Sequence, residues 1–489
     1  MQGSLDCRGQ LYGQLNAYIH ILYAFNTEFE AATMWTPKLE KSSGPLYLAI
    51  ADAIAADIAS GHLAPGARLP PQRSLAQALG LDFTTVTRAY QEAGRRGLVD
   101  GRVGQGTFVR SASPVQRTAA VGFVDMSMNL PPIPEDDRVA QRMWESLGKL
   151  HGPEMTRLML RYQEPGGALR DRQAGARWLQ GWLPGVEIER LLVAPGAQGA
   201  LSAIVATLVH RGDVILTEPL TYPGFISLAA HFGIRLVAME MDEAGPIPHA
   251  LERLIATLQP KALYCTPTLH NPTTRSWTLA RREEIAALAG KTGLPLIEDD
   301  AYGALPLAPL PPLASLATGP VYHVASVSKS LSPALRLAYL VAPDAGAALR
   351  LAGALRGTTA MASPLTATLA TEWIESGLAF EFLDVLRGEA RERQQLVGTL
   401  LPRETVEADR EGFHAWLKLP DGWSRGEFIS RLRNMGVSAV SSDTFAISAP
   451  PEAVRLSLGG AVTREELARS LAMISALLSD RPAMTSLIV

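Results

Sequence analysis

One lysine in a polar segment is the residue of this sequence best suited to covalent chemistry. Lys329 lies in the segment SVSKSLSPALR, residues 326–336, after an apolar run. The chain has seven lysines and 38 arginines, so arginine serves at most positions that need only a positive charge. A lysine amine can lose its proton in a dry pocket and attack an aldehyde, which an arginine cannot do. The nearby serines Ser326 and Ser328 and Arg336 are able to bind a phosphate. The segment predicts a pyridoxal phosphate site, with a solvated lysine in a polar loop as the alternative.

A carboxylate and a tyrosine follow another apolar run, LIEDDAY at residues 296–302. A carboxylate such as Asp299 beside the pyridine nitrogen keeps that nitrogen protonated and makes the ring an electron sink. Tyr302 has a hydroxyl that can bind the ring oxygen. A solvated acidic turn at a strand end is the alternative interpretation of these residues.

Three further segments add groups that a pyridoxal phosphate site needs. Asn271, in the segment HNPT, can donate to the ring oxygen, although Asn-Pro also marks simple turns. Ala197 and Gln198, in PGAQGA, precede a helix whose N-terminal amides can hold a phosphate. Tyr222, in PLTYPG, can stack on the ring, although an aromatic residue beside proline often only packs.

The elements that must position these residues form an α/β pattern from Val124 onward. Strand-like apolar runs alternate with helical stretches, which indicates a mainly parallel sheet. The runs are residues 191–193, 214–216, 262–265, 296–298 and 321–325. Open α/β sheets bind ligands at the ends of their strands, where the segments above are found.

A separate compact unit is predicted between residues 43 and 110. Apolar residues at helical spacing over 46–59 predict a first helix, and shorter helices are expected at 73–79 and from Thr84 to about Arg96. Two short β-prone runs within 98–109 complete a winged helix-turn-helix. We expect residues 1–42 to be a disordered leader and residues 111–123 to be a linker, because the latter are small and polar.

Composition limits the classes to which the chain can belong. Hydrophobic residues make up 47% of the chain, and the formal net charge is −3. The overall charge therefore does not predict binding to nucleic acid, and any DNA contact must come from a local patch of positive charge. The two cysteines are too few for a disulfide framework, which favours a reducing cytoplasm. No apolar segment is long enough to predict a membrane span.

The N-terminal unit closely resembles the GntR-type winged helix over residues 46–109. The resemblance rests on GHLAPGARLPPQRSLA at 61–76, on TVTRAY at 85–90 and on GQGTFV at 104–109. It implies double-stranded operator DNA as the partner, with the third helix in the major groove and the wing in the minor groove. The expected DNA-contacting residues are Arg73, Thr84, Thr85, Thr87, Arg88, Arg102 and Gly104. Phe83 occupies a position where relatives can carry an arginine, so no base preference follows from the resemblance.

Residues 124–480 resemble the fold type I aminotransferases, and the pairing with a GntR-like unit resembles the MocR family of regulators. The resemblance implies an α/β fold with a seven-stranded, mainly parallel sheet. It also implies a large subdomain at about 160–345 and a small C-terminal α+β subdomain at about 375–482, within a domain spanning 124–482. It further implies that Lys329 binds the cofactor aldehyde, Asp299 pairs with the ring nitrogen, and Tyr302 and Asn271 hold the ring oxygen. The phosphate ligands would be Ala197, Gln198, Ser326, Ser328, Arg336 and, from the neighbouring subunit of a homodimer, Tyr162. Arg455 would bind a substrate carboxylate.

Three functions are compatible with these motifs. The first is a cytoplasmic transcriptional regulator whose aminotransferase-like domain senses an amino compound or pyridoxal phosphate. The second is a working aminotransferase with an accessory DNA-binding unit, since every group that transamination needs is present. The third is a DNA-binding protein with a cofactor-free domain.

Overall fold

The computed structural model describes residues 35–37, 45–60, 62–64, 67–96, 98–102, 106–109, 123–148 and 150–480. The chain divides into two compact units, residues 1–118 and 119–489. The linker expected at 111–123 lies outside the described residues except for Phe123, and the expected leader does so except for residues 35–37.

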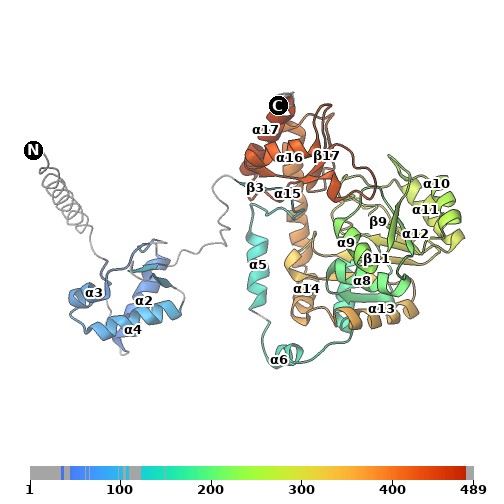
Figure 1. Cartoon of the computed structure of the whole chain (residues 1–489). Helices are drawn as coiled ribbons and strands as arrows, with labels where there is room; N and C mark the ends of the chain where they lie inside the picture. The colour runs from blue at the N-terminus through green and yellow to red at the C-terminus, as the bar shows by residue number, and fades with distance from the viewer. Residues whose placement is uncertain are drawn as a thin grey trace, which may run out of the picture. The chain divides into compact units, whose positions relative to one another are not determined.

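The described residues of the N-terminal unit form three helices followed by a hairpin (Figure 1). The helices are α2 (Leu46–Ala59), α3 (Gln72–Leu79) and α4 (Phe83–Arg95). Strands β1 (Val99–Arg102) and β2 (Gly106–Val109) pair in antiparallel fashion. Their apolar residues form one core that includes Ile50, Leu75, Val86, Tyr90 and Val109.

Trp35, within the expected leader, packs against this core. Its indole N–H donates to Asp57 Oδ2 at 2.8 Å. The packing of the N-terminal unit thus includes a residue that precedes α2 in the sequence and lies within the leader expected to be disordered.

The second unit is built around a seven-stranded sheet in the order β4-β12-β11-β10-β9-β5-β6. Six strands are parallel, and β12 runs antiparallel to both of its neighbours. The strands are β4 (Leu191–Ala194), β5 (Val214–Thr217), β6 (Arg235–Ala238), β9 (Ala262–Cys265), β10 (Leu296–Asp299), β11 (Val321–Ser326) and β12 (Ala338–Val341). The sequence placed its five strands correctly because runs of buried apolar residues are typical of parallel strands that are covered on both faces.

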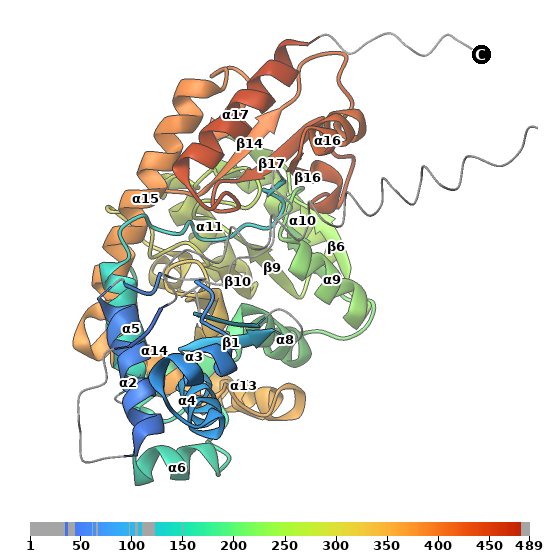
Figure 2. The same ribbon diagram turned by 90° about the vertical axis from the view of Figure 1, so that its left-hand side faces the viewer.

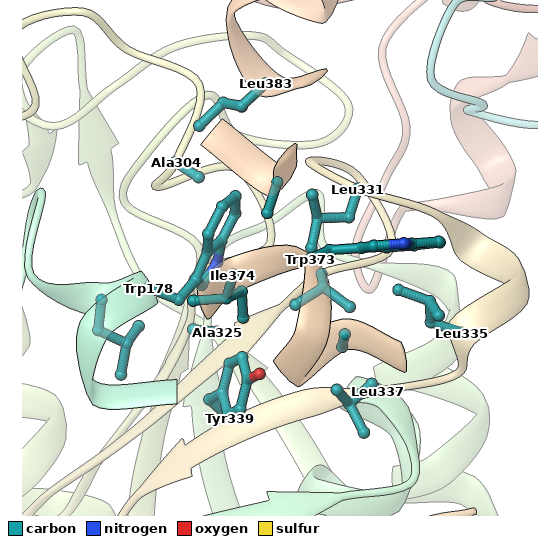
Figure 3. Packing of buried hydrophobic residues seen from close by; sticks show 14 of the residues in the cluster. Trp178, Ala304, Ala325, Leu331, Leu335, Leu337, Tyr339, Trp373, Ile374 and Leu383 are labelled. Atoms are coloured by element: carbon teal, nitrogen blue, oxygen red, sulfur yellow. The ribbon is translucent and has the colours of Figure 1, made fainter. Parts of the chain in front are cut away.

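Helices cover both faces of this sheet (Figure 1). On one face α8 (Gly196–Leu208), α9 (Pro223–Phe232) and α13 (Ala345–Thr358) pack on the strands in one apolar cluster. On the other face α10 (Pro248–Leu258), α11 (Leu279–Thr292) and α12 (Leu313–Leu316) form a second cluster. A third cluster joins α7 (Leu169–Leu179), α14 (Pro364–Ser376) and the start of α15 (Leu378–Leu400) to β12. Figure 3 shows its centre, with Trp178, Trp373 and Tyr339 among aliphatic side chains.

The C-terminal part forms a smaller subdomain with a four-stranded antiparallel sheet, β13-β14-β17-β16. Its strands are β13 (Val406–Ala408), β14 (His414–Lys418), β16 (Val440–Ser441) and β17 (Ala453–Ser457). Helices α16 (Arg425–Asn434) and α17 (Arg464–Ser479) pack beside this sheet together with the end of α15 (Figure 2). The short strand β3 (Val124–Asp125) pairs with β15 (Val437–Ser438), so the first described residues of this unit are attached to the small subdomain.

No helix in the described part of the chain is long and apolar enough to cross a membrane.

Candidate cofactor site and DNA-binding face

Lys329 lies in the turn that follows β11, close to the end of the central strands. Its ammonium group donates to the backbone carbonyl of Asn129. Burial lowers the pKa of Lys329 to about 8, and the positive charges of Arg455 and Arg336 act in the same direction. The amine therefore reaches its neutral, nucleophilic form more readily than an exposed lysine does.

The side chain of Asp299 points toward the site because side chains alternate between the two faces of β10. Glu298 and Asp300 face the opposite way, where the imidazole of His323 lies 3.0 Å from Glu298 Oε2 and 3.5 Å from Asp300 Oδ2. On the site's side, Tyr264 OH donates to Asp299 Oδ2 at 2.8 Å. Burial raises the pKa of the Asp299 carboxyl to about 6, so Asp299 is mainly a carboxylate at neutral pH.

The N-terminus of α8 and Arg336 meet at another part of the site. Gly196 begins α8 with φ +77°, a conformation that favours glycine. A Cβ atom at Gly196 would lie 3.4 Å from Arg336 Nη2, so the guanidinium group lies against the first turn that Ala197 and Gln198 share. Among the described residues no side chain caps α8. Its first N–H groups and the guanidinium group are thus suited to an anion.

The two serines lie where β11 ends. Ser326 is buried, and its hydroxyl accepts a hydrogen bond from the backbone N–H of Ser328 at 3.2 Å. Gln198 is held in place because its Nε2 donates to the carbonyl of Gly224 at 2.8 Å. Tyr222 is the residue before α9, and its hydroxyl pKa is raised by burial and by the charge of Asp299.

The remaining polar groups of the site form two hydrogen-bonded groups, one around Asn129 and one around Arg455. Asn129 Nδ2 donates to Tyr302 OH at 2.7 Å. Arg455 Nη1 donates to Asn271 Oδ1 at 2.9 Å, and Arg455 Nη2 donates to the carbonyl of Ser127. Burial lowers the pKa of Arg455 to about 10. A buried cation whose partners among the described residues are all neutral is suited to receive a carboxylate.

Ten of the twelve predicted cofactor and substrate residues lie at the ends of strands of the seven-stranded sheet or in the segments that follow those strands. Arg455 lies in the middle of β17 in the small subdomain and reaches the site through its hydrogen bond to Asn271. Tyr162 is different, because its side chain is 88% exposed in a loop after the short helix α6 (Pro153–Met159). Its predicted role needs a second copy of the chain and stays a prediction.

The sequence alone did not indicate two residues of this site, Tyr264 and Asn129. Tyr264 is buried within β9 and stacks on Phe225, with ring centroids 3.6 Å apart. A tyrosine in the otherwise apolar run ALYC was the one available signal, because a buried hydroxyl needs a partner. Asn129 lies in a stretch without periodicity, so no sequence pattern connects it with Lys329.

The predicted DNA-contacting residues lie around the start of α4. Asp82 caps this helix by accepting from the N–H of Thr84 at 2.8 Å and from its hydroxyl. Thr87 Oγ1 donates to Gln72 Oε1 at 2.9 Å. The Arg88 guanidinium group lies 4.5 Å from the ring centroid of Tyr47 on α2, and Thr85 is half-buried.

The other predicted DNA-contacting residues are on α3 and the wing. Arg73 lies on α3 with its guanidinium carbon 5.7 Å from the ring centroid of Phe83. Arg102 ends β1, but its side chain and the whole of Gly104 lie outside the described residues.

Comparison with known families agrees with this two-unit organisation. Residues 122–474 match the model of aminotransferase class I and II, and residues 46–109 match that of bacterial regulatory proteins of the gntR family. The chain belongs to the aminotransferase class I and II family. Its gntR-family domain makes it a regulator of the MocR type, which confirms both predicted resemblances.

Relatives that are named as regulators support this conclusion. The HTH-type transcriptional regulator YdeF of Bacillus subtilis is 32% identical over 91% of this chain and 97% of its own length. The probable rhizopine catabolism regulatory protein MocR of Rhizobium meliloti is 25% identical over 61% of this chain and 66% of its length.

A solved aminotransferase shares the fold of the second unit. LysN, the alpha-aminoadipate aminotransferase of Thermus thermophilus, is 28% identical with a TM-score of 0.64. The match covers 73% of this chain and 92% of LysN, which was solved in complex with N-(5'-phosphopyridoxyl)-L-leucine. The predicted fold type I is thereby confirmed.

The family implies pyridoxal 5'-phosphate as the cofactor, and the residues present fit this group. Asp299 Oδ1 is buried and has no hydrogen-bond partner in the part of the chain that the structure describes. An unpaired buried carboxylate oxygen is costly, and a protonated ring nitrogen would satisfy it. The uncapped start of α8 beside Arg336 offers the matching phosphate site.

Proposed function

We propose that this protein is a transcriptional regulator that binds operator DNA through its winged helix and senses an amino compound, or pyridoxal phosphate itself, at Lys329. The observation that carries this proposal is that one chain contains both a gntR-type unit and a site whose residues fit pyridoxal phosphate. The cofactor, when bound, supplies an electron sink and an aldehyde for reversible covalent capture of amines.

The chain's own residues have separate tasks in this proposal. Lys329 provides the amine that captures the aldehyde, and Asp299 keeps the ring nitrogen protonated. Ala197, Gln198, Ser326, Ser328 and Arg336 bind the phosphate, while Tyr302 and Asn271 hold the ring oxygen and Tyr222 covers the ring. Arg455 binds a carboxylate of the amino compound. Sensing requires that this ligand favour one arrangement of the chain over another.

We infer that the working unit is a homodimer. Helix α5 (Arg138–Leu147) and α6 lie at the edge of the second unit (Figure 1) and expose large apolar side chains. Trp144 is 73% exposed and Leu160 79%. Apolar surface of this kind is typical of an interface, and two DNA-binding units would then read paired half-sites. As a DNA-binding regulator, the protein would act in the cytoplasm.

The test of the proposed function separates DNA binding from sensing. We expect Lys329→Ala to lose covalent attachment of pyridoxal phosphate and the response to its effector, while the variant still shifts DNA from the region upstream of its own gene. The measurements are absorbance spectra and electrophoretic mobility shifts with and without pyridoxal phosphate. Lys291→Ala is the control, because Lys291 is an exposed lysine paired with Glu252 at 2.9 Å.

Two outcomes would contradict the regulatory proposal. Loss of DNA binding in Lys329→Ala would show that the lysine is structural. Pyridoxal phosphate could also attach without changing the DNA mobility shift, whichever amino acid is added. This outcome would show that the cofactor does not regulate DNA binding.

A second candidate function is a working aminotransferase, which the intact set of Lys329, Asp299 and Arg455 favours. Steady conversion of an amino acid to its keto acid over many turnovers would support it. A single conversion that ends with the cofactor in its amino form would support sensing.

A further inference from the structure

Phe83 is an exposed aromatic residue at the position of a recognition helix where base contacts are made. It is the first residue of α4, and 42% of its surface is accessible. In a helix-turn-helix the N-terminal residues of the second helix of the motif contact base edges in the major groove. Phe83 has no hydrogen-bonding group, so it can recognise only an apolar feature there.

Phe83 is not part of the apolar core of the N-terminal unit. The core of this unit is formed by residues such as Ile50, Leu75 and Val86, and Phe83 lies outside it. Among the described residues of the unit, Leu46 and Phe83 are the large apolar side chains that stay exposed. The exposed ring of Phe83 at the start of α4 is therefore available to contact DNA.

The polar neighbours of Phe83 are partly occupied within the protein. The hydroxyl of Thr84 donates to Asp82, and that of Thr87 donates to Gln72 and to the carbonyl of Phe83 at 3.0 Å. These bonds fix the first turn of α4 and leave the Phe83 ring as the projecting group.

Positive charge lies beside the ring. Phe83 lines a hollow of about 340 Å³ together with Arg68, Arg73 and residues of β2. The Arg73 guanidinium group lies near the ring. A Cβ atom on Gly106 would be 2.9 Å from Arg68 Nε, so the Arg68 side chain lies close to β2. Two arginines can receive a phosphate while the ring reaches the neighbouring base.

We propose that Phe83 is a specificity-determining residue that recognises the 5-methyl group of a thymine in each operator half-site. Thymine is the base whose edge in the major groove carries a methyl group, and phenylalanine is suited to contact it. This inference rests on the proposed DNA-binding function and adds the base that the helix prefers.

The test removes only the methyl group. A duplex is selected from a randomised pool by the full-length protein, and each thymine is then replaced in turn by deoxyuridine, which keeps base pairing. We expect replacement of one thymine per half-site to weaken binding about four-fold, the effect of leaving roughly one methyl group unburied. Phe83→Ala should bind the original duplex more weakly and be indifferent to uracil at that position.

Matched variants identify the residue responsible. Leu46→Ala removes a comparable exposed side chain, 49% accessible at the first residue of α2, and should keep the full sensitivity to uracil. Phe83→Leu keeps an apolar side chain and should keep part of the sensitivity to uracil. Thermal melting of each variant checks that the unit is folded.

The outcomes distinguish this inference from the function on which it rests. If the protein selects no duplex, both the DNA-binding proposal and this inference fail. If it selects a duplex but tolerates uracil at every position, or if Phe83→Ala stays as sensitive as the wild type, the thymine inference alone is overturned.

Discussion

At the scale of single residues, the protonation state of Lys329 decides how the site reacts. Burial and the two nearby arginines lower its pKa to about 8, while a free lysine titrates at about 10.4. Only the neutral amine attacks an aldehyde. The lowered pKa therefore makes on the order of a hundred-fold more neutral amine available at neutral pH than a free lysine would have.

This argument predicts a pH dependence. The rate of covalent attachment of pyridoxal phosphate to cofactor-free protein should rise about ten-fold per pH unit below pH 8 and level off above it. Arg455→Met removes a positive charge that lowers the pKa of Lys329, so the rate should level off at a higher pH. Stopped-flow absorbance measures both. The control is Arg253→Met, which changes an exposed arginine and should give the same pH profile as the wild type. An unshifted profile in Arg455→Met would refute the electrostatic argument.

At the scale of elements, the contact of α7 with β12 depends on one glycine. A Cβ atom at Gly175 would overlap the ring of Tyr339, which is fully buried in β12. Only glycine lets the helix approach the strand this closely. Tyr339 belongs to the apolar cluster of Figure 3, so this contact attaches α7 to that cluster.

Two glycine-to-alanine substitutions should therefore change the free energy of unfolding in opposite directions. Gly175→Ala is expected to lower the free energy of unfolding by about 1–3 kcal/mol, because the added carbon overpacks the core. Gly353→Ala, in the middle of α13 with open space around it, should raise it by about 0.5–1 kcal/mol, because alanine restricts the unfolded chain. Denaturant titration measures both. Equal effects of the two changes would contradict the close approach of α7.

The sequence predicted the elements of the sheet better than the contacts between them. Buried strands such as β9 and β11 were recognisable because their apolar runs are continuous. Lys329, Asp299 and Arg336 were recognisable because each chemical group suits the cofactor. The antiparallel direction of β12, the hydrogen bond from Tyr264 to Asp299 and the contact of Asn129 with Lys329 depend on long-range packing, which local patterns do not encode.

At the scale of the whole molecule, the exposed apolar residues around α5 and α6 predict self-association. Leu160→Asp should weaken the homodimer and shift the sedimentation coefficient toward that of a monomer, because a charge would be buried at the interface. Leu349→Asp is the control, since Leu349 is 77% exposed on α13 and is not part of this segment. A wild-type protein that sediments as a monomer would contradict the proposed dimer.

Residues of the stretch from Phe123 to Leu130 form hydrogen bonds with two cations of the site. This stretch directly follows the part of the sequence that joins the two units, and its carbonyl groups at Ser127 and Asn129 accept from Arg455 and Lys329. Those two cations are the groups that a bound carboxylate and a captured aldehyde would engage. Ligand and backbone thus compete for the same donors, so occupancy of the site would weaken the attachment of this stretch to Arg455 and Lys329.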